Sequence, residues 1–377
     1  MLSVLHNLIA WVPLGLPAFI FVITFVVFFH ELGHYLVARA CGVGIETFSI
    51  GFGGEIFGWT DRRGTRWKIS WLPLGGYVKF LGDADAASTP DRERVAGMDT
   101  GEKSRVLLFK PLYQRALVAV AGPTANFILA IVVFTLLFGL IGAKSLSTIV
   151  GSVMPNSPAA AAGVKPGDKI TAVDGKPVKL FYGELQGIVE DSKGKPLVFT
   201  IERGGRTSTV EIRPRTINVS NIYGGTQQAM AIGVGPADDT PANTVFIPVP
   251  LAKAPLIGVD QTWLIVDASL TGVWRMVSRQ ADARQLTGVV GIAGISQKAA
   301  SHGFYDLIYL AAFISVSIGL INLFPIPLLD GGHLLYYGCE AVLGRPLGER
   351  VQDVGFRVGL ALVVSLVIFT VWNDLVR

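Results

Sequence analysis

The chain has 377 residues, of which 51% are hydrophobic and only 16% are charged, and its formal net charge is +4. A soluble protein of this length would carry about 25% charged residues, so the composition excludes an ordinary soluble enzyme and predicts a polytopic membrane protein. The sequence shows no basic patch with interleaved aromatic residues, which argues against nucleic acid as a partner.

Four stretches are apolar enough to cross a lipid bilayer, since a spanning helix needs about 20 mostly apolar residues. In chain order they are about 8–37, 116–141, 307–329 and 358–372. The first stretch has no Lys or Arg before Arg39 and no small-residue cleavage site, so we interpret it as a retained span and not as a signal peptide. The last stretch is short, but snorkelling of a flanking arginine would extend it.

The distribution of Lys and Arg predicts how these spans are oriented. Residues 1–15 contain neither, whereas both are frequent between the first and second spans, and arginines recur between the third and fourth. Short loops rich in Lys and Arg stay on the cytoplasmic side. Both termini and the long segment from about 144 to 306 are therefore predicted to lie on the opposite side.

The first span is interrupted by the sequence "FFHELGHYLV". His30 and His34 are four residues apart, so on an α-helix both lie on one face, where two imidazoles can bind one Zn²⁺ at about 2.0–2.1 Å. In the H-E-x-x-H arrangement Glu31 is not a ligand; it takes a proton from the metal-bound water. The alternative is that all three are buried polar residues without a metal, and it is disfavoured because polar groups at membrane depth are costly.

The loop after the first span predicts β structure. "TRWKISW" alternates aromatic or apolar residues with polar ones, and Gly- and aromatic-rich stretches flank it; a period of two indicates a half-exposed strand. Two readings stay open. Either a β-ribbon enters the membrane interface with Trp59, Trp67 and Trp71 at headgroup depth, or the loop forms a small cytoplasmic hairpin.

The segment between the second and third spans has a different pattern. It holds "SPAAAAGVKPGDKITAVDGKPV", then the helix candidate "YGELQGIVEDS", then "KPLVFTIERGGRTSTVEIRP", which predicts a hairpin around Gly204-Gly205. This order resembles a single PDZ domain of the circularly permuted bacterial type. The apolar and aromatic pieces within 251–303 are expected to form helices, either lying on the membrane surface or serving as a soluble linker.

The third span supplies a candidate for the third metal ligand. Zinc in a catalytic site needs three protein ligands and an open position. Asp330 follows more than twenty uncharged residues, and Pro325 and Pro327 break the helix just before it, which is tolerated only where the backbone is buried or faces a water-filled cavity. His333 is the alternative ligand, and otherwise a supporting or packing residue.

Two asparagines in the membrane segments have two interpretations each. Asn126 in the second span and Asn322 in the third could form hydrogen bonds between helices. They could instead hold the substrate backbone or the oxyanion, and the balance is even for Asn126 and favours substrate contact for Asn322.

Together these motifs resemble the site-2 protease family of intramembrane zinc metalloproteases, most closely the bacterial regulator-of-sigma-E type. The resemblance rests on "FHELGHYLVAR", "PLGGYVKFLGD", "VAVAGPTANFILA" and "NLFPIPLLDGGHL", and it covers nearly the whole chain. It implies one zinc ion per chain bound by His30, His34 and Asp330, with Glu31 as the catalytic base and Asn322 in contact with substrate. The chain departs from the best-known Gram-negative members, which carry two PDZ domains.

The resemblance also implies a setting and a substrate class. We expect a multi-pass protein of the bacterial inner membrane, with both termini and the PDZ-like domain in the periplasm and the active site toward the cytoplasm. The expected partners are the lipid bilayer and single-span membrane proteins, such as an anti-sigma factor already shortened by another protease, or remnant signal peptides. A PDZ-like domain could bind a new C-terminus or exclude bulky ectodomains.

Two other classes of protein are alternatives to a protease. Intramembrane His, Glu and Asp also mark ion pathways in transporters, but the sequence shows no inverted repeat. The second alternative is a metal-free membrane scaffold that uses the PDZ-like module to gather partner proteins. The zinc content of the purified protein distinguishes such a scaffold from a protease.

The expected fold is about four transmembrane helices with a membrane-associated β-hairpin region and an inserted periplasmic PDZ-like α+β domain. The predicted segments are 1–40 (first span), 41–114 (cytoplasmic loop with the β-region), 115–143 (second span), 144–215 (PDZ-like domain), 216–305 (extension and amphipathic or linker helices), 306–332 (third span) and 333–377 (cytoplasmic loop and fourth span).

Overall fold

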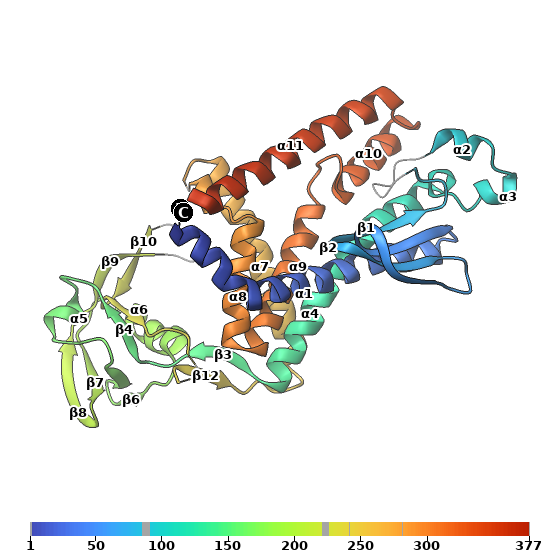
Figure 1. The fold of residues 1–377 in the computed structure, drawn as a ribbon. Coiled ribbons are helices and arrows are strands. Elements are labelled where there is room, and N and C mark those ends of the chain that lie inside the picture. Colours follow the sequence, from blue (N-terminus) through green and yellow to red (C-terminus); the bar gives the residue numbers. More distant parts are fainter. Residues whose placement is uncertain (1, 85–90, 221–225, 241, 281, 377) are drawn as a thin grey trace. The chain divides into compact units, whose positions relative to one another are not determined.

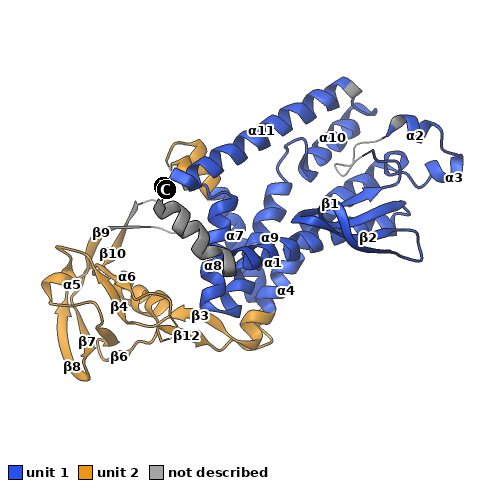
Figure 2. Ribbon diagram, in the orientation of Figure 1, with its two compact units in different colours: residues 1–135, 255–271, 286–377 blue, residues 136–254, 272–285 orange. Residues whose placement is uncertain are grey.

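The computed structural model describes residues 2–84, 91–220, 226–240, 242–280 and 282–376. Contacts divide the chain into two units (Figure 2). The first unit comprises Met1–Thr135, Pro255–Thr271 and Leu286–Arg377, and the second comprises Leu136–Ala254 and Gly272–Gln285.

Among the described residues, four helices have the length and composition of membrane spans. They are α1 (Leu2–Ala40), α4 (Leu112–Leu140), α9 (Phe304–Asn322) and α11 (Glu349–Val376), and each contains or overlaps one of the four predicted stretches (Figure 1). The expectation of four apolar spanning helices is thus confirmed in its coarse form.

For two of these helices a physical reason explains why the observed bounds differ from the predicted ones. Helix α9 ends at Asn322 and not at 329, because Pro325 and Pro327 cannot continue the backbone hydrogen-bond ladder. Helix α11 is longer than the predicted 358–372 because its first turns carry charged residues, which lower hydropathy without preventing a helix.

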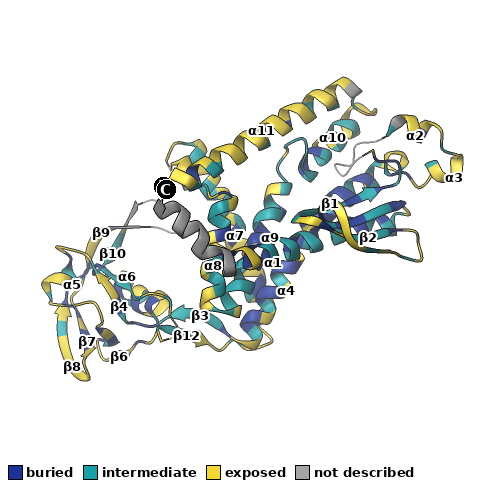
Figure 3. Ribbon diagram, in the orientation of Figure 1, coloured by how far each residue is buried: buried dark blue, intermediate teal, exposed yellow. Residues whose placement is uncertain are grey.

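The first unit is built around α1. Helices α9 and α8 (Val289–His302) pack against it and against each other, and Val22, Val26, Ala311 and Ile314 form a buried cluster there. Figure 3 shows this buried interior, in contrast to α11, which is exposed along most of its length. Helix α8 is therefore part of the helical bundle, which neither of the two sequence-based readings of 251–303 anticipated.

The N-cap residue of helix α8 is Gly288, which has no side chain to cap the helix, and the capping group comes from elsewhere in the chain. The Asp374 carboxylate of α11 accepts hydrogen bonds from the backbone amides of Gly288 and Gly291, at 3.1 and 2.8 Å. An acidic group at this end also interacts favourably with the helix dipole. Helix α11 is thereby tied to the bundle at its C-terminal end.

Strands β1 (Ile45–Thr60) and β2 (Arg66–Phe80) form a long antiparallel hairpin beside α1, consistent with the predicted β-region. The hairpin is folded back on itself, because residues 45–50 lie beside both 76–80 and 66–69. In the described part of the chain no further strand pairs with 76–80, so these residues form an outer edge of the sheet.

The bends in this hairpin coincide with glycines. Gly53 and Gly75 have φ angles of +90° and +132°, a region that residues with a Cβ rarely adopt. The "GFGG" and "LGG" stretches are thus the positions where each strand can turn and double over.

Aromatic packing fixes the folded hairpin on the end of α1. The Phe48 ring stacks on Trp67 at 4.3 Å between centroids and meets Tyr35 of α1 edge-on at 5.8 Å. Trp59 and Trp71, by contrast, are 50% and 73% exposed. One face of the sheet is therefore core, and the other presents large apolar side chains outward.

The second unit contains a four-stranded antiparallel sheet in the order β6–β5–β7–β8. Two short strand pairs, β4–β11 and β3–β12, and the pair β9–β10 accompany it. The bounds are β3 Ala143–Leu146, β4 Val150–Val153, β5 Lys169–Val173, β6 Lys176–Pro177, β7 Leu197–Arg203, β8 Arg206–Ile212, β9 Arg215–Ser220, β10 Thr226–Ala231, β11 Val234–Pro236 and β12 Thr244–Ile247, with short helices α5 (Pro158–Ala161) and α6 (Gln186–Asp191).

The local predictions for this unit are confirmed. Strands β7 and β8 form the expected hairpin, with Arg203 opposite Arg206 across the Gly204-Gly205 turn. The Ala-rich piece is the short helix α5 and the "YGELQGIVEDS" piece includes α6. The core of the second unit contains Ile170, Phe199 and Ile201, which are almost fully buried.

An ion pair braces this sheet and should make its stability depend on pH. Asp168, with a side chain only 1% exposed, accepts hydrogen bonds from Arg203 at 2.6 and 2.7 Å. These bonds hold the pKa of Asp168 below its ordinary value. A carboxyl group with a lowered folded-state pKa contributes stability that is present above the unfolded pKa, about 3.9, and is lost as the pH falls through the folded value.

Replacing Arg203 with alanine should therefore loosen the second unit. It leaves a buried carboxylate without its partner, at a cost of about 1–3 kcal/mol at neutral pH. Hydrogen exchange of the β5 and β7 amides in the full chain should speed up at pH 7. The difference from wild type should shrink as the pH falls below about 4 and vanish only once the pH is below the lowered pKa of Asp168. Arg213→Ala is the control, since Arg213 contacts only a backbone carbonyl; equal exchange in Arg203→Ala and wild type at pH 7 would contradict the assignment.

Candidate metal centre

The middle of the site is the C-terminal part of α1. His30 and His34 are one turn apart on the helix and are only 8% and 9% exposed, and their ring centroids lie 4.9 Å apart. Glu31 lies between them in sequence and is half-buried. The predicted common face is therefore present, and it points into the first unit.

The acid from the third predicted span meets this face. After α9 ends, residues 323–329 run without helix, with Leu328 at a φ of +105°, and helix α10 (Asp330–Leu343) begins at Asp330. A leucine at positive φ is strained backbone, which persists where surrounding structure enforces it. The proline-broken segment thus turns the chain so that Asp330 projects from the first residue of a helix toward α1.

The three side chains place their ligand atoms in a nearly equilateral triangle. His30 Nε2 lies 3.3 Å from His34 Nε2, and Asp330 Oδ2 lies 3.3 and 3.4 Å from these two nitrogens. A regular tetrahedron with edges of about 3.3 Å has its centre about 2.0 Å from each corner, which is the Zn–N distance found in proteins. Asp330 Oδ2 is buried and has no hydrogen-bond partner, so these donors fit a tetrahedral zinc ion with one open position.

The hydrogen bonding of His34 is also suited to a metal ligand. Its Nδ1 lies 2.8 Å from the backbone carbonyl oxygen of Val118 in α4. A carbonyl can only accept, so Nδ1 carries the proton and Nε2 keeps its lone pair for a metal.

Glu31 is held by the folded hairpin. Its carboxylate accepts a hydrogen bond from the backbone amide of Val78, and Gly76 packs against its side chain. Edge residues 76–80 of the sheet are thus in direct contact with the predicted base.

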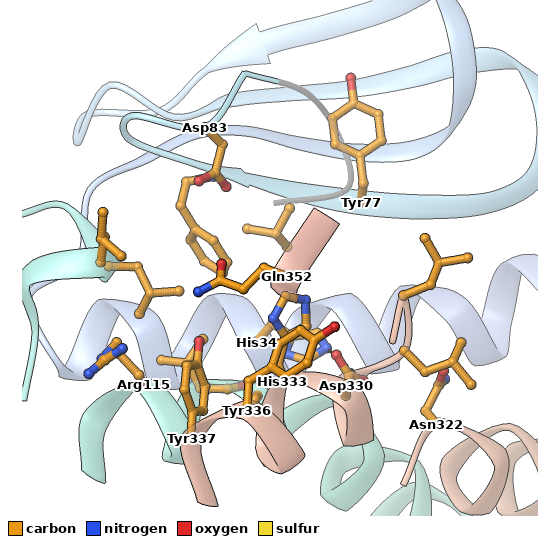
Figure 4. Close-up of a pocket in the computed structure, with 18 of the residues that line it drawn as sticks. His34, Tyr77, Asp83, Arg115, Asn322, Asp330, His333, Tyr336, Tyr337 and Gln352 are labelled. Atoms are coloured by element: carbon orange, nitrogen blue, oxygen red, sulfur yellow. Dashed lines mark hydrogen bonds and ion pairs between the residues drawn. The ribbon is translucent and has the colours of Figure 1, made fainter. Parts of the chain in front are cut away.

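A cavity of about 320 Å³ opens onto these groups. Helix α1 lines it with His30, Glu31 and His34, and the sheet edge contributes Tyr77 and Val78. Figure 4 shows His34, His333 and Asp330 gathered in one place, with Tyr77 projecting from the strand above them and Asn322 off to one side. The cavity therefore joins the candidate ligands, the candidate base and the open strand edge.

The remaining predicted residues take different positions. Asn322, at the end of α9, lines the cavity, as substrate contact would require. His333 also lines it, but it is not part of the group of three ligand atoms. Asn126 is fully buried behind His30, with its Nδ2 3.3 Å from His30 Nδ1, and it is absent from the cavity wall. Its position differs from that expected of a substrate-binding residue.

A second polar group closes one end of the cavity. Arg115 at the start of α4 pairs with Glu340 of α10 through two hydrogen bonds, of 3.0 and 2.5 Å, and its guanidinium lies 5.1 Å from the Tyr337 ring centroid. Burial raises the pKa of Tyr337 to about 12, so its phenol stays neutral at physiological pH. This group ties α10, and with it Asp330, to α4.

One residue of the site was not predicted from the sequence. Gly122 of α4 lies so close to the two imidazoles that a Cβ placed on it would overlap His34 Nε2. The available signal was the Gly-Pro pair inside an otherwise apolar span, which indicates a special packing requirement.

Comparisons with known proteins show which family the chain resembles. The model of peptidase family M50 matches residues 18–366. A protein of Agrobacterium fabrum named "Putative zinc metalloprotease Atu1380" is 43% identical over 357 residues, covering 95% of this chain and 94% of its own length. Metalloprotease MmpA of Caulobacter vibrioides is 40% identical over 387 residues, covering 96% of this chain and 95% of its own.

Two solved structures each match about a quarter of the chain. The PDZ domain of an SdrC-like protein from Listeria innocua is 22% identical and covers 24% of this chain and 94% of its own, with a TM-score of 0.20. The corresponding domain from Listeria monocytogenes is 23% identical and covers 26% and 94%, also with a TM-score of 0.20.

The family match extends over nearly the whole chain, and the relatives align with it almost from end to end. Four apolar helices of spanning length accompany that match. The chain is a membrane protein of peptidase family M50, a zinc metalloprotease.

Proposed function

We propose that this metalloprotease hydrolyses peptide bonds within or near the transmembrane segments of single-span membrane proteins, using one zinc ion per chain. The observation that carries the proposal is the triangle formed by His30, His34 and Asp330, with Glu31 beside it. The two histidines and Glu31 lie on α1, which has the composition of a membrane span, and Asp330 follows the break after a second such helix, α9. Polar side chains inside such a helix are costly in lipid unless they serve a function there.

The chemistry divides between the ion and the protein. Zinc bound at this site lowers the pKa of a water molecule and polarises the scissile carbonyl. Glu31 accepts the proton of the attacking water and passes it to the leaving amine, because it lies next to the ligands without belonging to their set. Asn322 holds the substrate backbone in this proposal, which its position in the cavity wall supports.

The sheet edge offers a way to present the substrate. A transmembrane helix hides its carbonyls in internal hydrogen bonds, so it must unwind locally before water can attack. Residues 76–80 form an outer strand edge that lines the same cavity as Glu31. An unwound segment could add to this edge as a strand, with its backbone held by main-chain hydrogen bonds.

We place the protein in the bacterial inner membrane, with both termini and the second unit in the periplasm and the active site toward the cytoplasm. The bias of Lys and Arg toward the 41–114 loop supports this orientation. The substrates in this setting are single-span proteins that have already lost most of their ectodomain, such as a pre-cleaved anti-sigma factor or a remnant signal peptide. The second unit, which contains the PDZ-like segment 144–215, acts as the filter that rejects intact ectodomains.

Purified protein in liposomes tests this directly. One reporter should be a single-span protein with a short outer segment, and a second should carry a folded ectodomain on the same span. Wild type should cleave only the short reporter, at a site within or beside its span. Failure to cleave either span would remove the proposal of intramembrane proteolysis.

A precise excision tests the filter. Leu146 of β3 faces Thr244 of β12, so residues 147–243 can be replaced by Asn-Gly, a dipeptide that closes two-residue hairpins. The excised protein should cleave the short reporter at a rate within a few-fold of wild type and should now also cleave the reporter with the ectodomain. Adding Glu31→Gln to the excised protein is the control, since it should stop both reactions. Loss of all cleavage on excision alone would show that the second unit is needed for the chemistry.

A further inference from the structure

The position of Asn126 suggests a task that the sequence did not indicate. The residue is fully buried where α4 meets α9: Ser315 Oγ of α9 donates a hydrogen bond of 2.9 Å to its backbone carbonyl. A Cβ built on Gly319, one turn further along α9, would lie 3.1 Å from Asn126 Cβ. The backbone of Asn126 is thus fixed by its contacts with α9, and this fixes the direction in which its side chain points.

That direction is toward His30. Asn126 Nδ2 lies 3.3 Å from His30 Nδ1, and Asn126 Oδ1 is buried without a hydrogen-bond partner. A half turn of the amide exchanges its oxygen and nitrogen, and so brings an acceptor to His30 Nδ1. The side chain can therefore accept a hydrogen bond from His30 Nδ1–H without any change in the space that it fills.

Metal chemistry requires such an acceptor. A histidine that binds zinc through Nε2 donates its Nδ1–H to a carbonyl or carboxylate, which fixes the ring and the tautomer. For His34 that acceptor is the carbonyl of Val118. His30 Nδ1 forms its hydrogen bond with Asn126. His34 would therefore be oriented by a backbone carbonyl, and His30 by a side chain.

We propose that Asn126 is a positioning residue for the metal: its side-chain carbonyl accepts the Nδ1–H of His30 and directs His30 Nε2 at the ion. This inference rests on the proposed metal site, and it replaces the expectation that Asn126 contacts substrate. It assigns the amide an effect on zinc affinity, whereas an amide that only joins helices would affect folding alone.

Two substitutions separate these roles. Asn126→Asp keeps an acceptor next to His30, and Asn126→Leu keeps a similar size without any polar atom. Zinc affinity of the full-length protein in detergent is measured by competition with a chelator, and the visible absorption of the Co²⁺ form reports the ligand geometry. Thr124→Val is the matched control, because Thr124 lies on the same helix, is exposed, and bonds only to its own helix backbone.

Asn126→Leu should bind zinc about 10- to 100-fold more weakly and change the Co²⁺ spectrum, while Asn126→Asp and Thr124→Val stay within a few-fold of wild type. Equal affinity in Asn126→Leu and wild type would overturn the inference, and so would equal weakening in Asn126→Leu and Asn126→Asp. If Asn126→Leu does not fold, Asn126→Ala takes its place with the same expectation.

The proposed metal site can fail separately. If wild type holds no zinc, or if His34→Ala holds zinc as tightly as wild type, the proposed metal site itself is wrong. That result does not depend on the Asn126 variants. Weak binding confined to Asn126→Leu and Asn126→Ala, with tight binding in wild type, is the pattern that supports the inference alone.

Discussion

Glu31→Gln should abolish proteolysis and leave the zinc ion in place. Glutamine has nearly the same shape and can still accept the hydrogen bond from the Val78 amide, but it cannot take a proton from water. General base catalysis contributes about 10²- to 10⁴-fold to a rate, so cleavage of the short reporter should fall by at least two orders of magnitude.

Two measurements on one sample check this. Cleavage is followed in liposomes, and zinc per chain is measured by elemental analysis of the same preparation. Glu93→Gln is the control, since Glu93 is an exposed glutamate outside the first unit's bundle of helices. Cleavage at the wild-type rate would exclude Glu31 as the base, and loss of zinc would mean that Glu31 binds the ion.

Gly122→Ala should disrupt the metal site through packing alone. A methyl group there would overlap His34 Nε2, the proposed ligand atom, and would lie 2.8 Å from His30 Cε1. The contacting atoms are rings whose orientation the metal requires, so they cannot move aside without loss of binding. Overpacking of this kind typically costs about 1–3 kcal/mol. If this cost falls entirely on metal binding, it corresponds to roughly 5- to 150-fold in zinc affinity.

The same chelator competition measures this, together with cleavage of the short reporter, and both should decline in parallel. Gly294→Ala is the matched control: Gly294 is also a helical glycine, on α8, but a Cβ there meets nothing within 4 Å. It should be neutral or slightly stabilising, because alanine favours a helix over glycine. Wild-type zinc affinity in Gly122→Ala would contradict the close approach of α4 to the two histidines.

The core of the site could be predicted because its signals are local. His30 and His34 lie at helical spacing, and polar groups within an apolar span stand out. Asp330 was recognisable for a related reason, since two prolines and the first acid after a long uncharged stretch mark the end of a span. Each of these patterns is read from a few adjacent residues, without knowledge of how the helices pack.

Other parts of the site depend on packing and were not accessible in this way. Whether Asn126 faces the cavity or the back of His30 is decided by the rotation of α4 relative to α1, and helix rotation leaves little trace in a uniformly apolar span. The requirement for glycine at 122 arises from the same contact.

In the fold, too, local features could be predicted from the sequence, whereas features that depend on packing could not. Alternation in 65–71 and the glycines beside it predicted strands, but not that the hairpin doubles over to put 45–50 between 66–69 and 76–80. Helix α8 likewise has a sequence that suits several environments, and its place beside α1 depends on a cap that Asp374 supplies from far along the chain.

The most direct test of the account is X-ray absorption at the zinc edge on the full-length protein. One zinc per chain is expected, with two imidazole nitrogens and a carboxylate oxygen at about 2.0–2.2 Å, and Asp330→Ala should lose the ion or change its ligand shell. A chain that holds no zinc, or an ion whose shell contains no imidazole or is unchanged in Asp330→Ala, would contradict it.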